Sequence, residues 1–201
     1  MRLPRREDAM RIFGAIGLNG SGKDEVVKYL HQRYNIPFIS IGDIVREMAD
    51  KKGITPTREN LHRISEEYIW KHGKEYFVSL VVERIKQNEW QTAGVTGIRT
   101  PDDVRYFMEQ FDDDFILFHV YVSDPHLRYE RTHKRGGRRD PQSYEKFLEQ
   151  DRTEESLFRI SEAIQWADYS LNNDGSIEHL HHEIDRILLE QRWLIDTEEG
   201  K

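Results

Sequence analysis

The fold of this chain is decided by the stretch Gly17-Leu18-Asn19-Gly20-Ser21-Gly22-Lys23-Asp24. An apolar run at 11–16 precedes it and predicts a short buried strand. Apolar residues at helical spacing follow it, so the order is strand, glycine-rich turn and helix. Glycines allow backbone N–H groups to wrap around an anion, and a helix N-terminus adds partial positive charge. The stretch is therefore predicted to bind phosphate.

From Gly17 to Lys23 the spacing is G-x-x-x-x-G-K, the P-loop pattern, in the strand-to-helix context that a P-loop requires. The lysine would reach the β- and γ-phosphates of ATP as a point charge. The Ser or Thr that usually supplies a hydroxyl to Mg²⁺ is replaced by Asp24. A carboxylate beside phosphates is repelled unless Mg²⁺ lies between them, so Asp24 is the predicted metal ligand. The residues predicted to bind ATP are Gly17, Asn19, Gly20, Ser21, Gly22, Lys23 and Asp24.

Composition excludes several classes of protein. The 201-residue chain has 30 Lys and Arg against 37 Asp and Glu, a net charge of −7, which argues against general coating of nucleic acid. It has no cysteine, hence no disulfide framework or thiolate metal site. No apolar run approaches the ~20 residues that span a bilayer, and the basic N-terminus lacks a signal-peptide core. We expect a cytoplasmic protein with a flexible leader at 1–10, acting on small nucleotides.

Strand and helix patterns alternate along the rest of the chain. This alternation predicts a single domain with a five-stranded parallel sheet, covered by helices on both faces in a three-layer α/β/α fold. Ligands of such sheets bind at the carboxyl ends of the strands. Strands are expected at 11–16, 38–41, 93–96, 115–122 and 167–171. Helices are expected after the P-loop, at 44–52, from 57, at 74–88, from 101, at 142–151, at 154–166 and from 177.

Two further segments resemble adenylate and cytidylate kinases. Residues 36–46 match their segment in which a strand ends in Gly-Asp and an Arg follows, and residues 96–100 match their third-strand segment. Residues 167–176 look like the closing segment of dephospho-coenzyme A kinases. The order of motifs is similar to a largely archaeal group described as adenylate-kinase-related. The chain therefore resembles the P-loop superfamily of nucleoside monophosphate kinases.

That resemblance implies acceptor-binding helices at about 43–90. In the family, the arginines that match Arg46 and Arg99 grip the acceptor phosphate. A guanidinium suits this task because its planar fork of donors matches phosphate oxygens and keeps its charge. Asp43 is predicted to bind substrate by orienting Arg46 or by holding a metal-bound water. It could equally cap the helix that follows it.

A basic segment resembles the arginine-rich lid of these kinases, which would span about 126–152. Six Arg or Lys accompany one Glu between 126 and 139. Arg131 and Arg135 are four apart and would share a helix face. Positive groups on the transferring phosphoryl lower the barrier to transfer, so the predicted catalytic residues are Lys23, Arg99, Arg135 and Arg139. An ordinary solvated basic helix is the alternative.

The predicted activity is phosphoryl transfer from ATP, with Mg²⁺, to a nucleoside monophosphate of the AMP, CMP or deoxynucleotide type. Thr96 stands where the family places an acidic residue that holds Mg²⁺ through water, and we hypothesise that Asp24 supplies the missing charge. One alternative is a dephospho-coenzyme A kinase with Asp43 as the base. Another is a nucleotide-binding regulator with weak or no kinase activity. A homodimer that uses 193–195 is left open.

Overall fold

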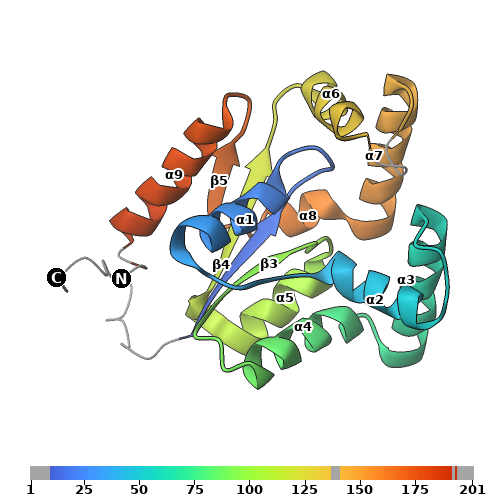
Figure 1. Ribbon diagram of the computed structural model, residues 1–201, viewed down its shortest axis with the longest axis horizontal. Helices are drawn as coiled ribbons and strands as arrows, with labels where there is room; N and C mark the ends of the chain where they lie inside the picture. Colours follow the sequence, from blue (N-terminus) through green and yellow to red (C-terminus); the bar gives the residue numbers. More distant parts are fainter. Residues whose placement is uncertain (1–9, 137–140, 192, 194–201) are drawn as a thin grey trace.

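The computed structural model describes residues 10–136, 141–191 and 193 of the chain. Its strands form one parallel sheet in the order β2-β3-β1-β4-β5 (Figure 1), which confirms the predicted α/β/α fold. The strands are β1 (Arg11–Ile16), β2 (Phe38–Ser40), β3 (Thr92–Thr96), β4 (Phe115–Tyr121) and β5 (Tyr169–Asn172). The α-helices are α1 (Lys23–Tyr34), α2 (Ile41–Lys51), α3 (Arg58–His72), α4 (Tyr76–Gln87), α5 (Pro101–Phe111), α6 (Pro125–Arg135), α7 (Tyr144–Phe158), α8 (Ile160–Ile164) and α9 (Ile177–Glu190).

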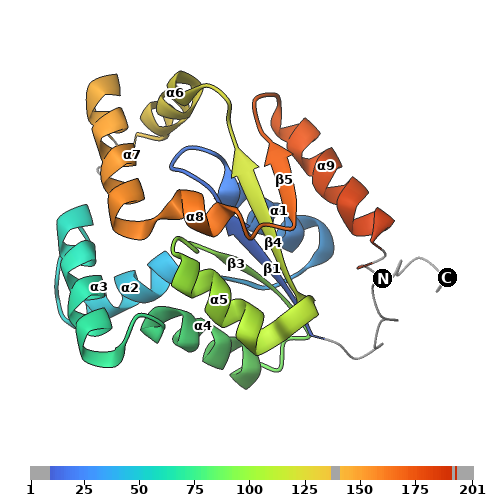
Figure 2. The ribbon, with the colours of Figure 1, turned by 180° about the vertical axis from the view of Figure 1, so that it is seen from behind.

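Successive residues of the central strands face opposite helical layers. On β1, Phe13 and Ala15 belong to the apolar cluster of α1 and α9, which cover the face seen in Figure 1. Ile12 and Ile16 belong to the cluster of α4, α5 and α8, on the face seen in Figure 2. This is the two-residue period of a strand with both faces buried. It explains why 11–16 and 115–122 appear in the sequence as near-continuous apolar runs.

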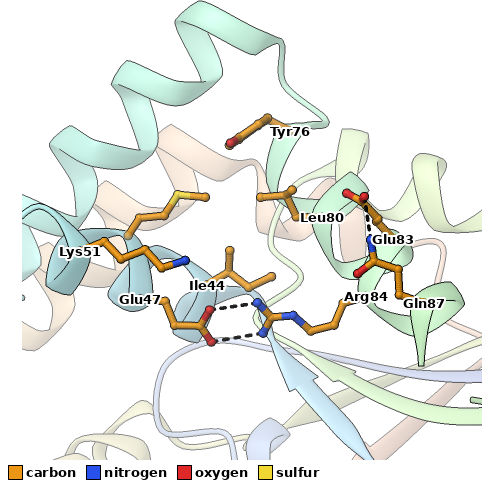
Figure 3. Close-up of a pocket in the computed structure, with 9 residues that line it drawn as sticks. Ile44, Glu47, Lys51, Tyr76, Leu80, Glu83, Arg84 and Gln87 are labelled. Atoms are coloured by element: carbon orange, nitrogen blue, oxygen red, sulfur yellow. Dashed lines mark hydrogen bonds and ion pairs between the residues drawn. The ribbon is translucent and has the colours of Figure 1, made fainter.

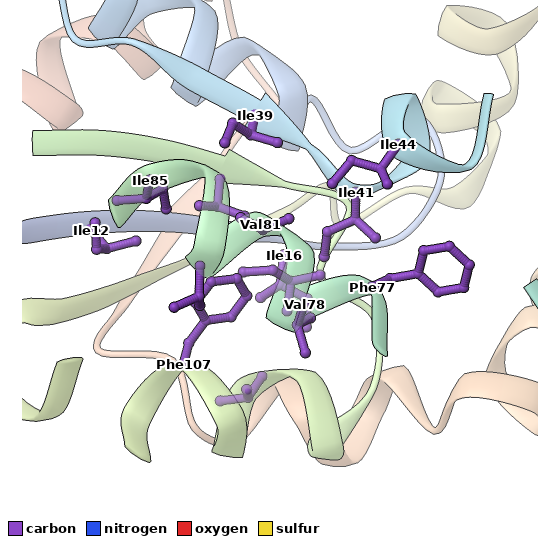
Figure 4. Packing of buried hydrophobic residues seen from close by; sticks show 14 of the residues in the cluster. Ile12, Ile16, Ile39, Ile41, Ile44, Phe77, Val78, Val81, Ile85 and Phe107 are labelled. Carbon is purple, nitrogen blue, oxygen red and sulfur yellow. The ribbon is translucent and has the colours of Figure 1, made fainter. Parts of the chain in front are cut away.

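The cluster on the second face is the larger of the two (Figure 4). Val81 and Ile85 of α4 and Phe107 of α5 have no exposed surface and lie against Ile12 and Ile16 of β1. Burying one such side chain contributes about 1.5–3 kcal/mol. This packing fixes α4 and α5 against the second face of the sheet.

The boundaries of three predicted helices were wrong. The helix after β2 begins at Ile41 rather than at 44, because Ile41 is itself a buried core residue and the helix starts directly after Ser40. The two helices expected at 142–151 and 154–166 are divided elsewhere: α7 runs unbroken to Phe158. No glycine or proline interrupts that stretch, and α7 ends where Arg159 adopts a left-handed conformation with φ of 52°.

Parallel pairing brings the ends of β1, β2 and β3 together at one edge of the sheet. Ala15 of β1 and Ser40 of β2 are both in register with Thr96, the last residue of β3. The P-loop after β1 therefore lies beside the segments that begin at Ile41 and Gly97. We call this the phosphate edge of the sheet.

Two expectations concern the outside of the molecule. None of the helices in the described ranges is both long and apolar enough to cross a lipid bilayer. Trp193 packs on Phe13 and Tyr169, with ring centroids 6.1 and 5.6 Å away, and is 9% exposed. It belongs to the protein's own core and gives no support to a homodimer; residues 194 and 195 lie outside the described residues.

Candidate phosphate-binding site

The glycines of the P-loop allow close packing against α6 and the loop after β5. Gly20 and Gly22 have φ of 79° and 94°, in the left-handed region that favours glycine. A Cβ on Gly20 would lie 2.5 Å from the carbonyl oxygen of Arg128. One on Gly22 would lie 2.3 Å from Asn173 Nδ2. The loop conformation therefore requires glycine at both positions.

The N-termini of α1 and α2, both at the phosphate edge, lack a side-chain cap among the described residues. The first N–H groups of a helix need an acceptor from outside the helix, and an anion can supply it. Among the described helices, α4 and α8 also lack a side-chain cap, and the other five have one. Their capping residues are Thr57, Thr100, Asp124, Ser143 and Ser176.

Lys23 is the first residue of α1 and is half-buried. Burial lowers the pKa of its ammonium, and the positive charges of Arg99 and Arg135 lower it further. Asp24 and Glu154 act in the opposite direction. The structure thus gathers three of the predicted catalytic cations around the end of the P-loop. A phosphate group would relieve their mutual repulsion.

Asp24 and Thr96 are in direct contact: Thr96 Oγ1 donates to Asp24 Oδ1 over 2.5 Å. Partial loss of water disfavours the charge of this carboxylate. Lys23 and the Thr96 hydroxyl outweigh that effect and hold the pKa of Asp24 below its usual value. Asp24 remains exposed on its solvent side and is thus available to a cation. The described residues contain no cluster of three metal-ligating side chains, but Mg²⁺ needs only one or two carboxylates when phosphates complete its shell. The donor set therefore fits Mg²⁺ bound together with a nucleotide.

Asp43 contacts Arg46 rather than a helix end. Arg46 Nε donates to Asp43 Oδ1 over 2.9 Å, and Arg46 Nη2 also contacts that oxygen. Because α2 begins at Ile41, Asp43 lies in its first turn and the N-cap position belongs to Ser40. Of the roles weighed for Asp43, the geometry agrees with orienting Arg46. Capping is wrong.

Arg99 is exposed in the short segment that joins β3 to α5. Its backbone is held firmly, because Arg99 N and Thr100 N both donate to Asp103 Oδ2 over 3.0 Å. Its guanidinium lies over the ring of Phe158, 5.1 Å from the centroid. Arg99 is thus presented at the phosphate edge by β3 and steadied by the end of α7.

The basic residues of α6 divide into two groups. Arg135, the last residue of the helix, is exposed and close enough to Lys23 and Asp24 to lower the pKa of each. Arg131 points elsewhere: its Nη1 donates to the carbonyl oxygen of Asn173 over 2.7 Å, and its Nη2 to that of Gly175 over 3.4 Å. Arg139 lies outside the described residues.

Arg128 and Asn173 are part of the site, although the sequence analysis did not single them out. Arg128 is 4% exposed and ties the P-loop to α7, donating to the Asn19 carbonyl oxygen over 3.0 Å and to Asp151 over 2.5 Å. Asn173 Nδ2 donates to the Ser21 carbonyl oxygen over 2.8 Å. Arg128 was one member of a basic run and Asn173 one member of a turn. No local pattern distinguished either from its neighbours.

Ser21 has an unexpected orientation for a predicted ATP-binding residue. Its side chain is fully buried, and its Oγ has no hydrogen-bond partner among the described atoms. Its backbone N–H donates to the Leu18 carbonyl oxygen over 3.1 Å and closes a turn of the loop. Ser21 shapes the loop from within, so its hydroxyl is not presented to an anion.

A separate hollow of about 240 Å³ lies between α2 and α4 (Figure 3). Glu47 and Arg84 close one side of it with a double ion pair of 2.9 and 3.2 Å. None of the predicted site residues lines it. Ile44, Glu47 and Lys51 share the lining face of α2 by their helical spacing, whereas Arg46 projects from the other side. The hollow is therefore not part of the phosphate edge.

The chain is similar to proteins of one family over most of its length. Residues 16–147 match the family model described as an AAA domain. A UPF0200 protein of Pyrococcus abyssi is 36% identical over 174 residues, which cover 86% of this chain and 92% of the relative. The chain belongs to the UPF0200 family. A second UPF0200 protein, from Thermococcus kodakarensis, is 35% identical over 86% of this chain and 93% of its own length. The expected resemblance to an archaeal P-loop kinase-like group is confirmed.

Solved structures place this UPF0200 chain in the P-loop kinase fold. A shikimate kinase from Acinetobacter baumannii, in complex with shikimate, has a TM-score of 0.59 at 18% identity. The match covers 93% of this chain and 97% of that one. A gluconokinase from Sinorhizobium meliloti has a TM-score of 0.56 at 14% identity, over 94% and 98% of the two chains. At such low identities these likenesses describe the fold and not the acceptor.

Proposed function

We propose that this protein transfers the γ-phosphoryl group of ATP, with Mg²⁺, to a small nucleotide-like acceptor, namely a nucleoside monophosphate. The observation that carries the proposal is the meeting of two sets of cations at one edge of the sheet. Lys23 follows β1, whereas Arg46 and Arg99 follow β2 and β3, whose ends are in register with the end of β1. One set suits a donor triphosphate and the other an acceptor phosphate.

Each group has a distinct task in this proposal. The P-loop N–H groups and Lys23 bind the donor phosphates, with Asp24 as the residue that would hold Mg²⁺. A bound Mg²⁺ neutralises charge on the phosphates during transfer. Arg46, oriented by Asp43, and Arg99, steadied on Phe158, bind the acceptor phosphate. Arg135 stabilises charge on the transferring phosphoryl from the α6 side.

A hydroxyl acceptor, as in a dephospho-coenzyme A kinase, is the second candidate. It would need a general base, and Asp43 is the carboxylate beside Arg46. Two donors of Arg46 already bind one oxygen of Asp43, which suits an arginine-orienting role better than proton abstraction. The resemblance of residues 167–176 to dephospho-coenzyme A kinases also has a structural explanation, because Asn173 in this segment donates a hydrogen bond to the P-loop. These contacts favour a monophosphate acceptor.

The test is an acceptor screen with purified protein, ATP and Mg²⁺. The acceptors are AMP, CMP, UMP, the deoxynucleoside monophosphates and dephospho-coenzyme A, and the readout is ADP formation. We expect ADP to form with a monophosphate and to disappear in Lys23→Met. The exposed Lys71→Met, on α3, is the matched control and should keep full activity. Turnover with dephospho-coenzyme A alone would replace the proposal by the second candidate. Tight ATP binding without acceptor-dependent turnover would identify a nucleotide-binding regulator.

A further inference from the structure

Two arginines from distant segments bind to α7. Arg58, the first residue of α3, donates from Nη1 to Gln150 Oε1 over 2.8 Å, and its Nη2 lies 3.4 Å from Glu154 Oε1. Arg99, after β3, lies over the ring of Phe158. Both views of the fold show one end of α3 close to α7 (Figures 1 and 2). Arg58 therefore links the predicted acceptor-binding helices to the predicted lid segment.

The residues that receive these arginines form a stripe on one face of α7. Gln150, Glu154 and Phe158 are spaced four apart, so they lie above one another. One helical turn rises about 5.4 Å. Arg58 is bound at the first two members of the stripe and Arg99 at the third. The two arginines are thus held at neighbouring positions of one helix face. This is the arrangement that one phosphate-bearing molecule needs in order to reach both.

Glu154 is an unusual residue in this position. Its side chain is only 15% exposed, and it is near enough to Lys23 to raise the pKa of that ammonium. A carboxylate with so little water needs cations around it. Beside Arg58 it provides the negative charge that a phosphate would bring. Arg58 keeps 41% of its side chain exposed, so part of its fork of five donors remains open to solvent.

We propose that Arg58 is a third acceptor-binding arginine, and that Glu154 is an internal anion that occupies it until the acceptor phosphate displaces it. The proposal rests on the proposed function for the identity of the acceptor. A phosphate dianion carries more charge than a carboxylate and can accept two donors of one guanidinium. It therefore competes successfully for Arg58. Gln150, which is neutral, holds the arginine in place throughout the exchange.

The test measures anion binding in a double-mutant cycle at Arg58 and Glu154. AMP and inorganic phosphate are titrated by calorimetry, with and without saturating ADP, into wild type, Arg58→Gln, Glu154→Gln and the double variant. We expect Arg58→Gln to weaken binding of AMP and phosphate about tenfold, the value of one charge-assisted hydrogen bond. Glu154→Gln should tighten binding several-fold, most strongly at low salt, because a competing charge is removed. That gain should vanish in the double variant.

Matched controls separate this exchange from a structural role. Arg63→Gln and Glu149→Gln make the same charge changes at exposed positions of α3 and α7 and should alter binding less than twofold. If Glu154 had only a structural role, Glu154→Gln would bind AMP and phosphate more weakly and would have a lower Tm. That result would overturn the proposal. So would unchanged binding in Arg58→Gln, an equal gain with and without Arg58, or a wild type that binds neither probe. The proposed function fails separately, when phosphate binds but no acceptor supports ADP formation.

Discussion

Thr96 at the end of β3 donates a hydrogen bond to Asp24 in the first turn of α1. The two residues are 72 positions apart in the chain, and each is the residue at which the sequence departs from the usual kinase pattern. Because the carboxylate is ionised, the bond is charge-assisted. The contact places the carboxylate of Asp24 beside residue 96, the position at which the family carries an acidic residue. This is the arrangement required if Asp24 supplies the charge that is missing at residue 96, which we call the relocated-charge hypothesis.

Asp24→Ser should weaken the affinity of the enzyme for Mg²⁺, because it removes the predicted protein ligand of the ion. We expect the Mg²⁺ concentration for half-maximal activity to rise at least about tenfold, the lower end of effects seen for outer-shell partners of metals. The measurement is a Mg²⁺ titration of acceptor-dependent ADP formation. The double variant Asp24→Ser, Thr96→Asp restores the usual arrangement and should recover most of the loss. If Asp24→Ser keeps its activity and its Mg²⁺ dependence, the relocated-charge hypothesis is wrong.

Gly22→Ala should destabilise the protein and abolish ATP binding. The left-handed φ costs an alanine about 1–2 kcal/mol. The new Cβ would also displace Asn173 Nδ2 from the Ser21 carbonyl oxygen, at about 1 kcal/mol more. Gly53→Ala separates the two effects, because Gly53 also has a positive φ of 66° but nothing within 4 Å of its Cβ position. Urea unfolding and ATP titration of both variants check the prediction, and equal losses would contradict it.

Arg128→Met should be strongly destabilising. The substitution removes the ion-pair partner of Asp151, whose side chain is 15% exposed. It also leaves the Asn19 carbonyl oxygen without this donor. Removing one partner of such a buried pair costs about 3–5 kcal/mol. The double variant Arg128→Met, Asp151→Leu removes both charges and should recover a large part of the stability. Urea unfolding measures this recovery, and ATP affinity should remain reduced in both variants because the P-loop has lost its brace.

The contact between α1 and α9 should make stability fall at high pH. Tyr29 and Tyr34 both donate to the carboxylate of Asp185 over 2.6 Å. Burial and this carboxylate raise the pKa of Tyr29 to about 12 and raise the pKa of Tyr34 as well. The ordinary pKa is 10.0, so the stabilisation is complete below pH 10 and is lost as pH rises toward 12.

Urea unfolding at pH 9 and pH 11 tests this expectation. The double variant Tyr29→Phe, Tyr34→Phe should be less stable than wild type at pH 9 but should lose less between the two values. Tyr121→Phe, at an exposed position, should follow the wild type. A double variant with the same alkaline loss as wild type would show that other groups are responsible.

Local patterns predicted the architecture well because each element carries its own signal. β1, the start of α5 at Pro101 and the start of α3 directly after Thr57 all lie where the sequence indicated. Helix boundaries failed where the deciding force was not local. Ile41 belongs to α2 because its side chain is buried in the core beneath the sheet. The true end of α7, at Arg159, has no glycine or proline to mark it.

The sequence by itself determined that this chain is a P-loop protein with a parallel sheet. Glycine spacing and apolar periodicity are local properties that act over a few residues. Only the tertiary structure decided which charged side chains meet. It paired Asp24 with Thr96 and tied Asn173 to Ser21 across 152 positions. It also turned Arg131 away from the phosphate edge and set Arg58 against Glu154. These contacts depend on strand order and helix packing, which no short stretch of sequence encodes.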